Sequence, residues 1–170
     1  INYRGNKMSA VIESHHDDHH HGPAKGFSRW LYTTNHKDIG SLYLWFSFIM
    51  LFVGGAMAMV IRAELFEPGS QIVSPEFYNQ MVTNHGLIMV FGVIMPAFVG
   101  LANWMIPMQI GAPDMALPRL NNLSFWILPA AFGVLLSTFL MEGGAPNFGW
   151  TFYAPLSTEY APPTVTFFIF

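Results

Sequence analysis

Three long stretches of the chain carry no charged side chain. They cover residues 39–61, 77–113 and 120–141, and each is longer than 20 residues. A helix of about 20 apolar residues, rising 1.5 Å per residue, crosses the hydrocarbon core of a bilayer. The pattern therefore predicts transmembrane helices at about residues 39–63, 77–107 and 120–141.

The ends of these runs indicate how the chain continues. Residues 77–113 are too many for one helix, and Pro107, Gly111 and Pro113 near the end predict an exit into a loop. A further apolar run, residues 164–170, has no charge, cap or breaker, which predicts a fourth helix cut within its span. We expect an all-α membrane protein of which this chain is a fragment.

Basic residues next to the predicted helices indicate the orientation, because Lys and Arg beside spanning helices tend to stay in the cytoplasm. Lys25, Arg29 and Lys37 precede the first predicted helix. Arg119 lies between the second and the third, whereas the other two loops hold only Arg62 among several acids. We therefore expect a multi-pass protein with a cytoplasmic N-terminus.

Composition excludes several classes of function. The 170 residues are 52% hydrophobic and only 10% charged, whereas about a quarter of the residues of soluble domains are charged, so an ordinary soluble enzyme is excluded. A net charge of −3 with seven Lys and Arg argues against nucleic-acid binding. Because cysteine is absent, a metal here needs His, Met or oxygen ligands.

The N-terminal region is rich in histidine, with five imidazoles within residues 15–21. Dense imidazole tracts can chelate transition metals. Nothing nearby predicts a second shell that would fix their geometry. We therefore expect residues 1–26 to form a disordered cytoplasmic tail, followed by a partial membrane domain over residues 27–170.

His85 is the only ionisable side chain besides tyrosine within the three charge-free runs, and such a residue usually marks a functional site. It lies about 12 Å along its helix from the outer end. Gly86 and Gly92 leave flat surface on that helix, and Pro96 predicts a kink. From position alone, two interpretations stay open: a ligand of heme iron, or a histidine hydrogen-bonded between helices.

Two charged residues at opposite ends also have two interpretations each. Arg62 ends the first helix on the side of His85, where it either reaches a cofactor or marks the membrane boundary. Asp114 lies on the cytoplasmic side near Asn103 and Asn121. It either gathers protons for a water file or is a solvated loop acid.

Six sequence blocks together form a recognisable pattern. They are WLYTTNHKDIG at 30–40, IRAEL at 61–65, TNHG at 83–86, IGAPDMA at 110–116, PRLNNLSFW at 118–126 and GWT at 149–151. In this order they closely resemble the N-terminal part of subunit I of the cytochrome c oxidases, in the heme–copper oxidase superfamily.

This resemblance implies the first three helices and the start of the fourth in a bundle of twelve. Members hold a low-spin heme a, a high-spin heme a and a copper ion, and they reduce oxygen to water while pumping protons. The implied setting is the lipid of a bacterial inner membrane, with cytochrome c as electron donor and oxidase subunits II and III as partners. The ligands of the copper centre lie beyond this chain, so the fragment alone is expected to be inactive.

The resemblance also implies roles for residues near the predicted heme. His85 matches an axial ligand of the low-spin heme, and Arg62 matches the arginine that hydrogen-bonds the heme formyl group. Tyr78 and Trp150 match residues on the propionate side. Asn84 departs from the alanine or methionine of many relatives, which implies altered contacts around the ligand.

Proton and cation sites follow from the same resemblance. Asp114 matches the acid at the mouth of the D proton pathway, Asn103 and Asn121 match asparagines near its entrance, and Tyr43 matches a residue along it. A calcium site found in part of the family is matched by three residues of the first outer loop: Glu64, Gly69 and Gln71.

Other functions stay open from the sequence. Subunit I of a quinol oxidase is the nearest alternative, although residues 35–38 and 112–115 favour the cytochrome c branch. Nitric oxide reductases match poorly around Asp114. An alternative of another class is a non-enzymatic membrane anchor with a His-rich metal-binding tail.

Overall fold

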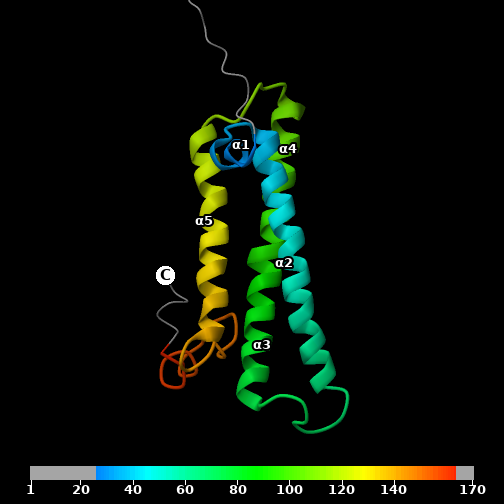
Figure 1. The fold of residues 1–170 in the computed structure, drawn as a ribbon, viewed down its shortest axis with the longest axis vertical. Coiled ribbons are helices and arrows are strands. Elements are labelled where there is room, and N and C mark those ends of the chain that lie inside the picture. The colour runs from blue at the N-terminus through cyan, green and yellow to red at the C-terminus, as the bar shows by residue number, and fades with distance from the viewer. Residues whose placement is uncertain (1–25, 164–170) are drawn as a thin grey trace, which may run out of the picture.

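The computed structural model describes residues 26–163. Within this range the chain forms helices and loops but no strand, and three helical spans are long and apolar enough to cross a membrane. They cover His36–Glu64, Pro75–Ile110 and Pro118–Leu140, and they run alongside one another (Figure 1). The all-α prediction is confirmed. The predicted tail, apart from Gly26, and the predicted fourth helix lie outside the described residues.

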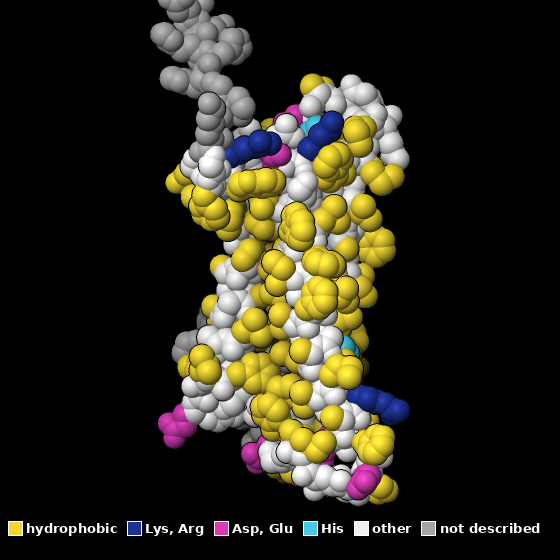
Figure 2. All heavy atoms as spheres, turned by 45° about the vertical axis from the view of Figure 1, so that its right-hand side comes forward, with side chains coloured by type: hydrophobic (Ala, Val, Ile, Leu, Met, Phe, Trp, Pro, Cys, Tyr) yellow, Lys and Arg dark blue, Asp and Glu magenta, His cyan; other side chains and the backbone are white. Residues whose placement is uncertain are grey.

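The surface matches a chain that spans a membrane. Figure 2 shows hydrophobic side chains along the middle of the elongated molecule, with charged side chains gathered towards its two ends. Only about a quarter of each apolar span is buried within the described residues. The remaining apolar surface is left for lipid or for further helices.

The first span, α2 (His36–Glu64), begins three residues earlier than predicted. The Asn35 side chain accepts a hydrogen bond from the Lys37 amide at 2.8 Å and so caps the helix. Lys37 and Asp38 therefore belong to the first turn, where the carboxylate also faces the positive end of the helix dipole.

A short helix, α1 (Phe27–Tyr32), precedes this span and was not predicted. It is tied to α2 by Arg29, whose guanidinium lies 2.9 Å from the Asp38 carboxylate. Hydrogen bonds and charge from Asp38 raise the pKa of Arg29. This pair holds α1 against the start of α2.

The second span is one continuous helix in three parts: α3 (Pro75–Leu87), the π-helix η1 (Ile88–Ile94) and α4 (Met95–Ile110). It ends three residues after the predicted boundary at residue 107. Pro107 lies inside the helix, and it is tolerated there because the helix ends within one turn after it. Its carbonyl accepts the Ala112 amide, and Gly111 takes the left-handed conformation that ends a helix.

The π-helix accommodates Pro96, the residue at which the sequence predicted a kink. Proline has no N–H for the preceding turn, and that turn widens so that the Met95 amide reaches the Val90 carbonyl. The Ser47 hydroxyl of α2 donates to the Val93 carbonyl in the same region at 2.8 Å. The neighbouring helix thus supplies a donor beside the proline.

The third span consists of α5 (Pro118–Ser137) and a 3₁₀ turn, η2 (Thr138–Leu140). Aromatic rings join it to α2. Tyr43 meets Phe125 edge to face at 5.2 Å between centroids, and Phe46 meets Phe132 at 5.5 Å. Such pairs contribute about 0.5–1.5 kcal/mol each beyond their burial.

Helices α2 and α4 approach closely through Gly40 and Gly100. A Cβ added to Gly40 would lie 2.9 Å from the Gly100 carbonyl oxygen and 2.6 Å from the Trp104 ring. Small residues allow such contact between membrane helices. This approach brings Asn103 of α4 against the polar start of α2.

Adding one methyl group at this contact tests its importance. Gly40→Ala is expected to lower the free energy of unfolding of the full-length protein by about 1–3 kcal/mol, because backbone atoms cannot move aside as side chains can. Gly133→Ala is the control, since a Cβ there meets nothing within 4 Å. Denaturation in detergent micelles measures both, and equal stability of the two variants would contradict the close contact.

Candidate functional site

Polar residues gather in two groups near opposite ends of the spans. The first, the His85 group, lies where α3 packs against α2, towards the loop that joins them. The second, the Asp114 group, lies around the loop between α4 and α5 (Figure 1). The sequence predicted both groups and placed them on opposite sides of the membrane.

The imidazole of His85 is half-buried and held in one orientation. Its Nδ1 lies 2.9 Å from the Gly54 carbonyl oxygen of α2. A carbonyl can only accept, so Nδ1 carries a hydrogen, and in the neutral ring Nε2 then presents its lone pair. Among the described residues nothing bonds to Nε2. Metal-ligating histidines characteristically donate one ring N–H to such a partner and leave the other nitrogen for the metal.

The surface around His85 is flat. A Cβ on Gly55 would meet no atom of the described residues within 4 Å, and the nearest neighbours of one on Gly86 would be side-chain atoms of Trp150, at 3.8–3.9 Å. The structure therefore brings Trp150 beside the residue that follows His85. Tyr78 precedes His85 by seven residues and is half-buried on the same face of α3.

The loop that carries Trp150 is docked on α3 by two polar residues next to His85. Thr83 accepts the Gly149 amide at 3.0 Å, and fully buried Asn84 donates to the Pro146 carbonyl at 3.2 Å. Asn84 thus contacts the loop that supplies Trp150. Sequence reasoning missed Thr83, although a polar residue beside an intramembrane histidine was a usable signal.

Arg62 lies near the end of α2, seven residues after Gly55 and on the same face. Its side chain is exposed and forms no ion pair or hydrogen bond with the described residues. The His85 group thus combines an oriented imidazole, whose Nε2 is open, with glycines on two helices. At the same end lies the Arg62 guanidinium, which has no partner among the described residues. These features fit the planar iron porphyrin that the family resemblance implies.

In the second group, one carboxylate oxygen of Asp114 receives three donors. Its Oδ1 lies 2.7 Å from the Met115 amide, 3.3 Å from the His36 amide and 3.2 Å from His36 Nδ1. His36 was not predicted as a site residue. The signal was its place after Asn35, at the first position of a helix, where backbone N–H groups lack partners.

A chain of hydrogen bonds joins three of the predicted proton-path residues across α2, α4 and α5. The side-chain amide of Asn121 donates to Asn103 Oδ1 at 2.6 Å. The Ser124 hydroxyl donates to the backbone carbonyl of Asn121 at 2.7 Å. The Tyr43 hydroxyl lies 2.9 Å from Ser124 Oγ. Both Tyr43 and Asn103 are buried. No direct hydrogen bond joins Asp114 to this chain among the described residues, but His36 and Tyr43 lie on one face of α2.

The predicted calcium ligands lie in the loop between α2 and α3. Buried Glu64 accepts three backbone amides with its two carboxylate oxygens: Gln71 at 2.8 Å, Ile72 at 2.9 Å and Val73 at 3.0 Å. Gly69 has a φ of +105°, which lets this loop turn back. Residues 26–163 contain no group of three His, Cys, Asp or Glu side chains that could hold a metal. The Glu64 carboxylate stabilises the loop through these hydrogen bonds. Calcium binding by this loop stays a prediction.

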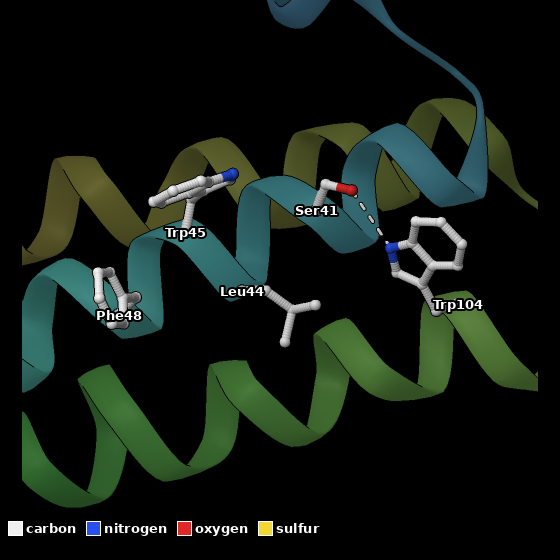
Figure 3. Close-up of a pocket in the computed structure, with 5 residues that line it drawn as sticks. All are labelled: Ser41, Leu44, Trp45, Phe48 and Trp104. Atoms are coloured by element: carbon white, nitrogen blue, oxygen red, sulfur yellow. Dashed lines mark hydrogen bonds between the residues drawn. The ribbon is translucent and has the colours of Figure 1, made fainter.

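A groove of about 360 Å³ between α2 and α4 is mainly apolar. Figure 3 shows its lining residues, Ser41, Leu44, Trp45, Phe48 and Trp104. The Trp104 indole N–H donates to Ser41 at 3.2 Å, and Lys37 lies 5.8 Å from the Trp104 ring. The groove contains no candidate acid, base or ligand, so it is not a candidate active site.

Comparison with known proteins gives consistent results. The family described as "Cytochrome C and Quinol oxidase polypeptide I" matches residues 38–170. "Cytochrome c oxidase subunit 1" of Corynebacterium diphtheriae is 48% identical over 146 residues, which are 85% of this chain and 26% of that protein. "Probable cytochrome c oxidase subunit 1-alpha" of Streptomyces avermitilis is 48% identical over 145 residues, 84% of this chain and 25% of that protein.

A third relative has a name that joins two subunits. "Heme-copper oxidase subunit I+III" of Aeropyrum pernix is 47% identical over 137 residues, which are 81% of this chain and 17% of that protein. The chain thus spans about a quarter or less of the length of these relatives.

The three amides bound by Glu64 generate a prediction for the loop. In Glu64→Gln the carboxylate charge is lost and an NH₂ group faces backbone donors. Exchange of the Gln71, Ile72 and Val73 amides is therefore expected to accelerate by about tenfold or more. Hydrogen exchange followed by mass spectrometry measures this. The control is Glu67→Gln, which changes an exposed acid of the same loop. Unchanged exchange in Glu64→Gln would show that the Glu64 carboxylate does not hold these amides.

Proposed function

This chain belongs to the family of cytochrome c and quinol oxidase polypeptide I, and from that premise we propose that it is part of the catalytic subunit of a terminal respiratory oxidase. The whole subunit oxidises cytochrome c, reduces oxygen to water and pumps protons. The observation that carries this proposal is the oriented His85, whose Nε2 is open beside a flat glycine surface. The residues past this chain would complete the oxygen-reducing centre.

His85 is proposed as an axial ligand of a low-spin heme a. When bound, the heme would accept and pass on single electrons. The Gly54 carbonyl accepts the Nδ1 hydrogen bond, which fixes the plane of the imidazole ring and leaves Nε2 for the iron. Further parts of the subunit would hold a high-spin heme a and a copper ion.

Other residues of the His85 group are proposed to contact the edge of the porphyrin. Arg62 donates to the heme formyl group, where a charged donor is stronger than a neutral one. Trp150 and Tyr78 lie on the propionate side. The support is that Trp150 packs beside Gly86 and that Arg62 has no partner among the described residues.

The Asp114 group is proposed as the entrance of a proton pathway. Asp114 takes up protons, and the amides of Asn121 and Asn103 and the hydroxyl of Tyr43 orient water behind it. Their hydrogen bonds across three helices support this role. The excess of basic residues near this end supports a cytoplasmic N-terminus and uptake from the cytoplasm.

The proposed setting is the lipid of a bacterial inner membrane, with oxidase subunits II and III as partners. The name of the Aeropyrum relative joins subunits I and III in one chain, which supports the latter partner. Glu64, Gly69 and Gln71 remain a proposed calcium site. Calcium titration with hydrogen exchange of this loop would test it.

A quinol oxidase remains the second candidate, because the family description names both donors. The relatives named cytochrome c oxidase favour the first. Turnover of the full-length enzyme with reduced cytochrome c and with a quinol would separate the two. Family membership argues against the non-enzymatic anchor, and its proposed metal-binding tail lies outside the described residues.

Removing the proposed heme ligand is expected to change the optical spectrum. In the full-length enzyme His85→Ala should abolish the low-spin heme band of the reduced protein, because nothing replaces Nε2. His85→Met should instead retain a shifted band, since a thioether also ligates heme iron. His20→Ala is the control, and an unchanged band in His85→Ala would remove the assignment.

Neutralising the proposed entrance acid is expected to affect protons but not hemes. Asp114→Asn should slow oxygen reduction strongly and suppress outward proton release in reconstituted vesicles, because an amide can neither attract nor exchange protons. Heme spectra should stay normal. Glu142→Gln, an exposed acid near the other end, is the control. Unimpaired turnover and pumping would show that Asp114 is a solvated loop acid.

A further inference from the structure

His36 is a buried histidine at the start of α2, and its two ring nitrogens differ in their hydrogen bonding. Only 6% of the residue is exposed. Its Nδ1 lies 3.2 Å from Asp114 Oδ1, while its Nε2 is buried and has no hydrogen-bond partner among residues 26–163. A carboxylate favours the tautomer, or the cation, that carries a hydrogen on Nδ1.

Packing alone does not explain this residue. A buried ring nitrogen without a partner loses its hydration and gains nothing in return, so an apolar side chain of similar size would be tolerated better. The start of α2 does not need the imidazole either, because Asn35 already caps the helix. What the imidazole adds is its contact with Asp114.

That contact acts on one oxygen of the carboxylate. All three donors that reach Asp114 converge on Oδ1. Two are backbone amides, of His36 and Met115, and the third is the His36 ring. Oδ2 has no hydrogen bond within residues 26–163, and the Asp114 side chain remains 35% exposed. The carboxylate therefore has one anchored and one free oxygen.

We infer that His36 is a positioning residue for proton uptake: its Nδ1–H holds Asp114 Oδ1 so that Oδ2 stays free to take up the proton. The inference rests on the proposed role of Asp114 as the entrance acid. Without the ring contact, two backbone amides still bind Oδ1, but they allow the carboxylate to rotate about the Cβ–Cγ bond of Asp114. The free oxygen is then presented in the productive direction for only part of the time.

Two variants of His36 separate its side-chain donor from its volume. His36→Asn keeps an NH₂ donor near the position of Nδ1, whereas His36→Leu keeps an apolar side chain of similar size and no donor. Ser41→Ala, one turn further along α2 and without contact to Asp114, is the matched control. All are made in the full-length enzyme, reconstituted into vesicles.

Three measurements are made on each variant: the rate of proton uptake during a single turnover, the thermal unfolding midpoint with the heme spectrum, and the infrared carboxyl band that disappears in Asp114→Asn. His36→Leu is expected to slow uptake by about tenfold, as for loss of one charge-assisted hydrogen bond. Its unfolding midpoint should stay the same or rise, since the unpaired nitrogen is gone. The carboxyl band should shift in His36→Leu and stay in place in His36→Asn, which should also keep near-parental uptake.

The opposite results overturn the inference. Parental uptake in His36→Leu removes the positioning role, and slow uptake accompanied by a lower midpoint or lost heme shows a structural role instead. If His36→Asn is as slow as His36→Leu, the donor at Nδ1 is not the cause. Parental uptake in Asp114→Asn refutes the proposed entrance itself, which distinguishes that failure from failure of His36 alone.

Discussion

A bilayer offers no water to buried polar groups, and this constraint organises the described structure around one face of α2. Polar groups placed in hydrocarbon must find partners within the protein. Residues one or two turns apart on one face of α2 provide them. His36, Tyr43, Ser47 and the Gly54 carbonyl bind one group each on the Asp114 loop, on α5, on η1 and on α3. At 1.5 Å per residue this line extends over about 27 Å, nearly the thickness of the hydrocarbon core.

This single face connects the two ends at which function is proposed. Near one end it orients His85 and near the other it holds Asp114, so electrons and protons would be handled on opposite sides of the membrane. Between them, Gly40 lets α4 approach, and the π-helix lets the chain pass Pro96. A shift of α2 along its axis would therefore disturb both groups together. The proposed heme and proton sites share one rigid support.

The differences between prediction and structure have local causes. Helix ends moved by three residues at Asn35 and Pro107, because a side-chain cap and a left-handed glycine decided where hydrogen bonding starts and stops. The short helix α1 depends on an ion pair between Arg29 and Asp38, which no apolar pattern records. The Glu64 carboxylate binds backbone amides that the loop brings back to it, a contact that the sequence did not predict, and the calcium role of Glu64 stays a prediction.

The sequence alone determined the three spans of residues 26–163, the all-α class and the family, because charge-free length and spaced motifs are properties of the chain itself. It also identified His85, Asp114 and the two asparagines as candidates. Only the tertiary structure decided which atoms they use. His85 leaves Nε2 open because Gly54 on another helix occupies Nδ1, and Asp114 leaves Oδ2 free because His36, 78 residues away, binds Oδ1. Such pairings depend on the packing of distant segments, which no local pattern of residues specifies.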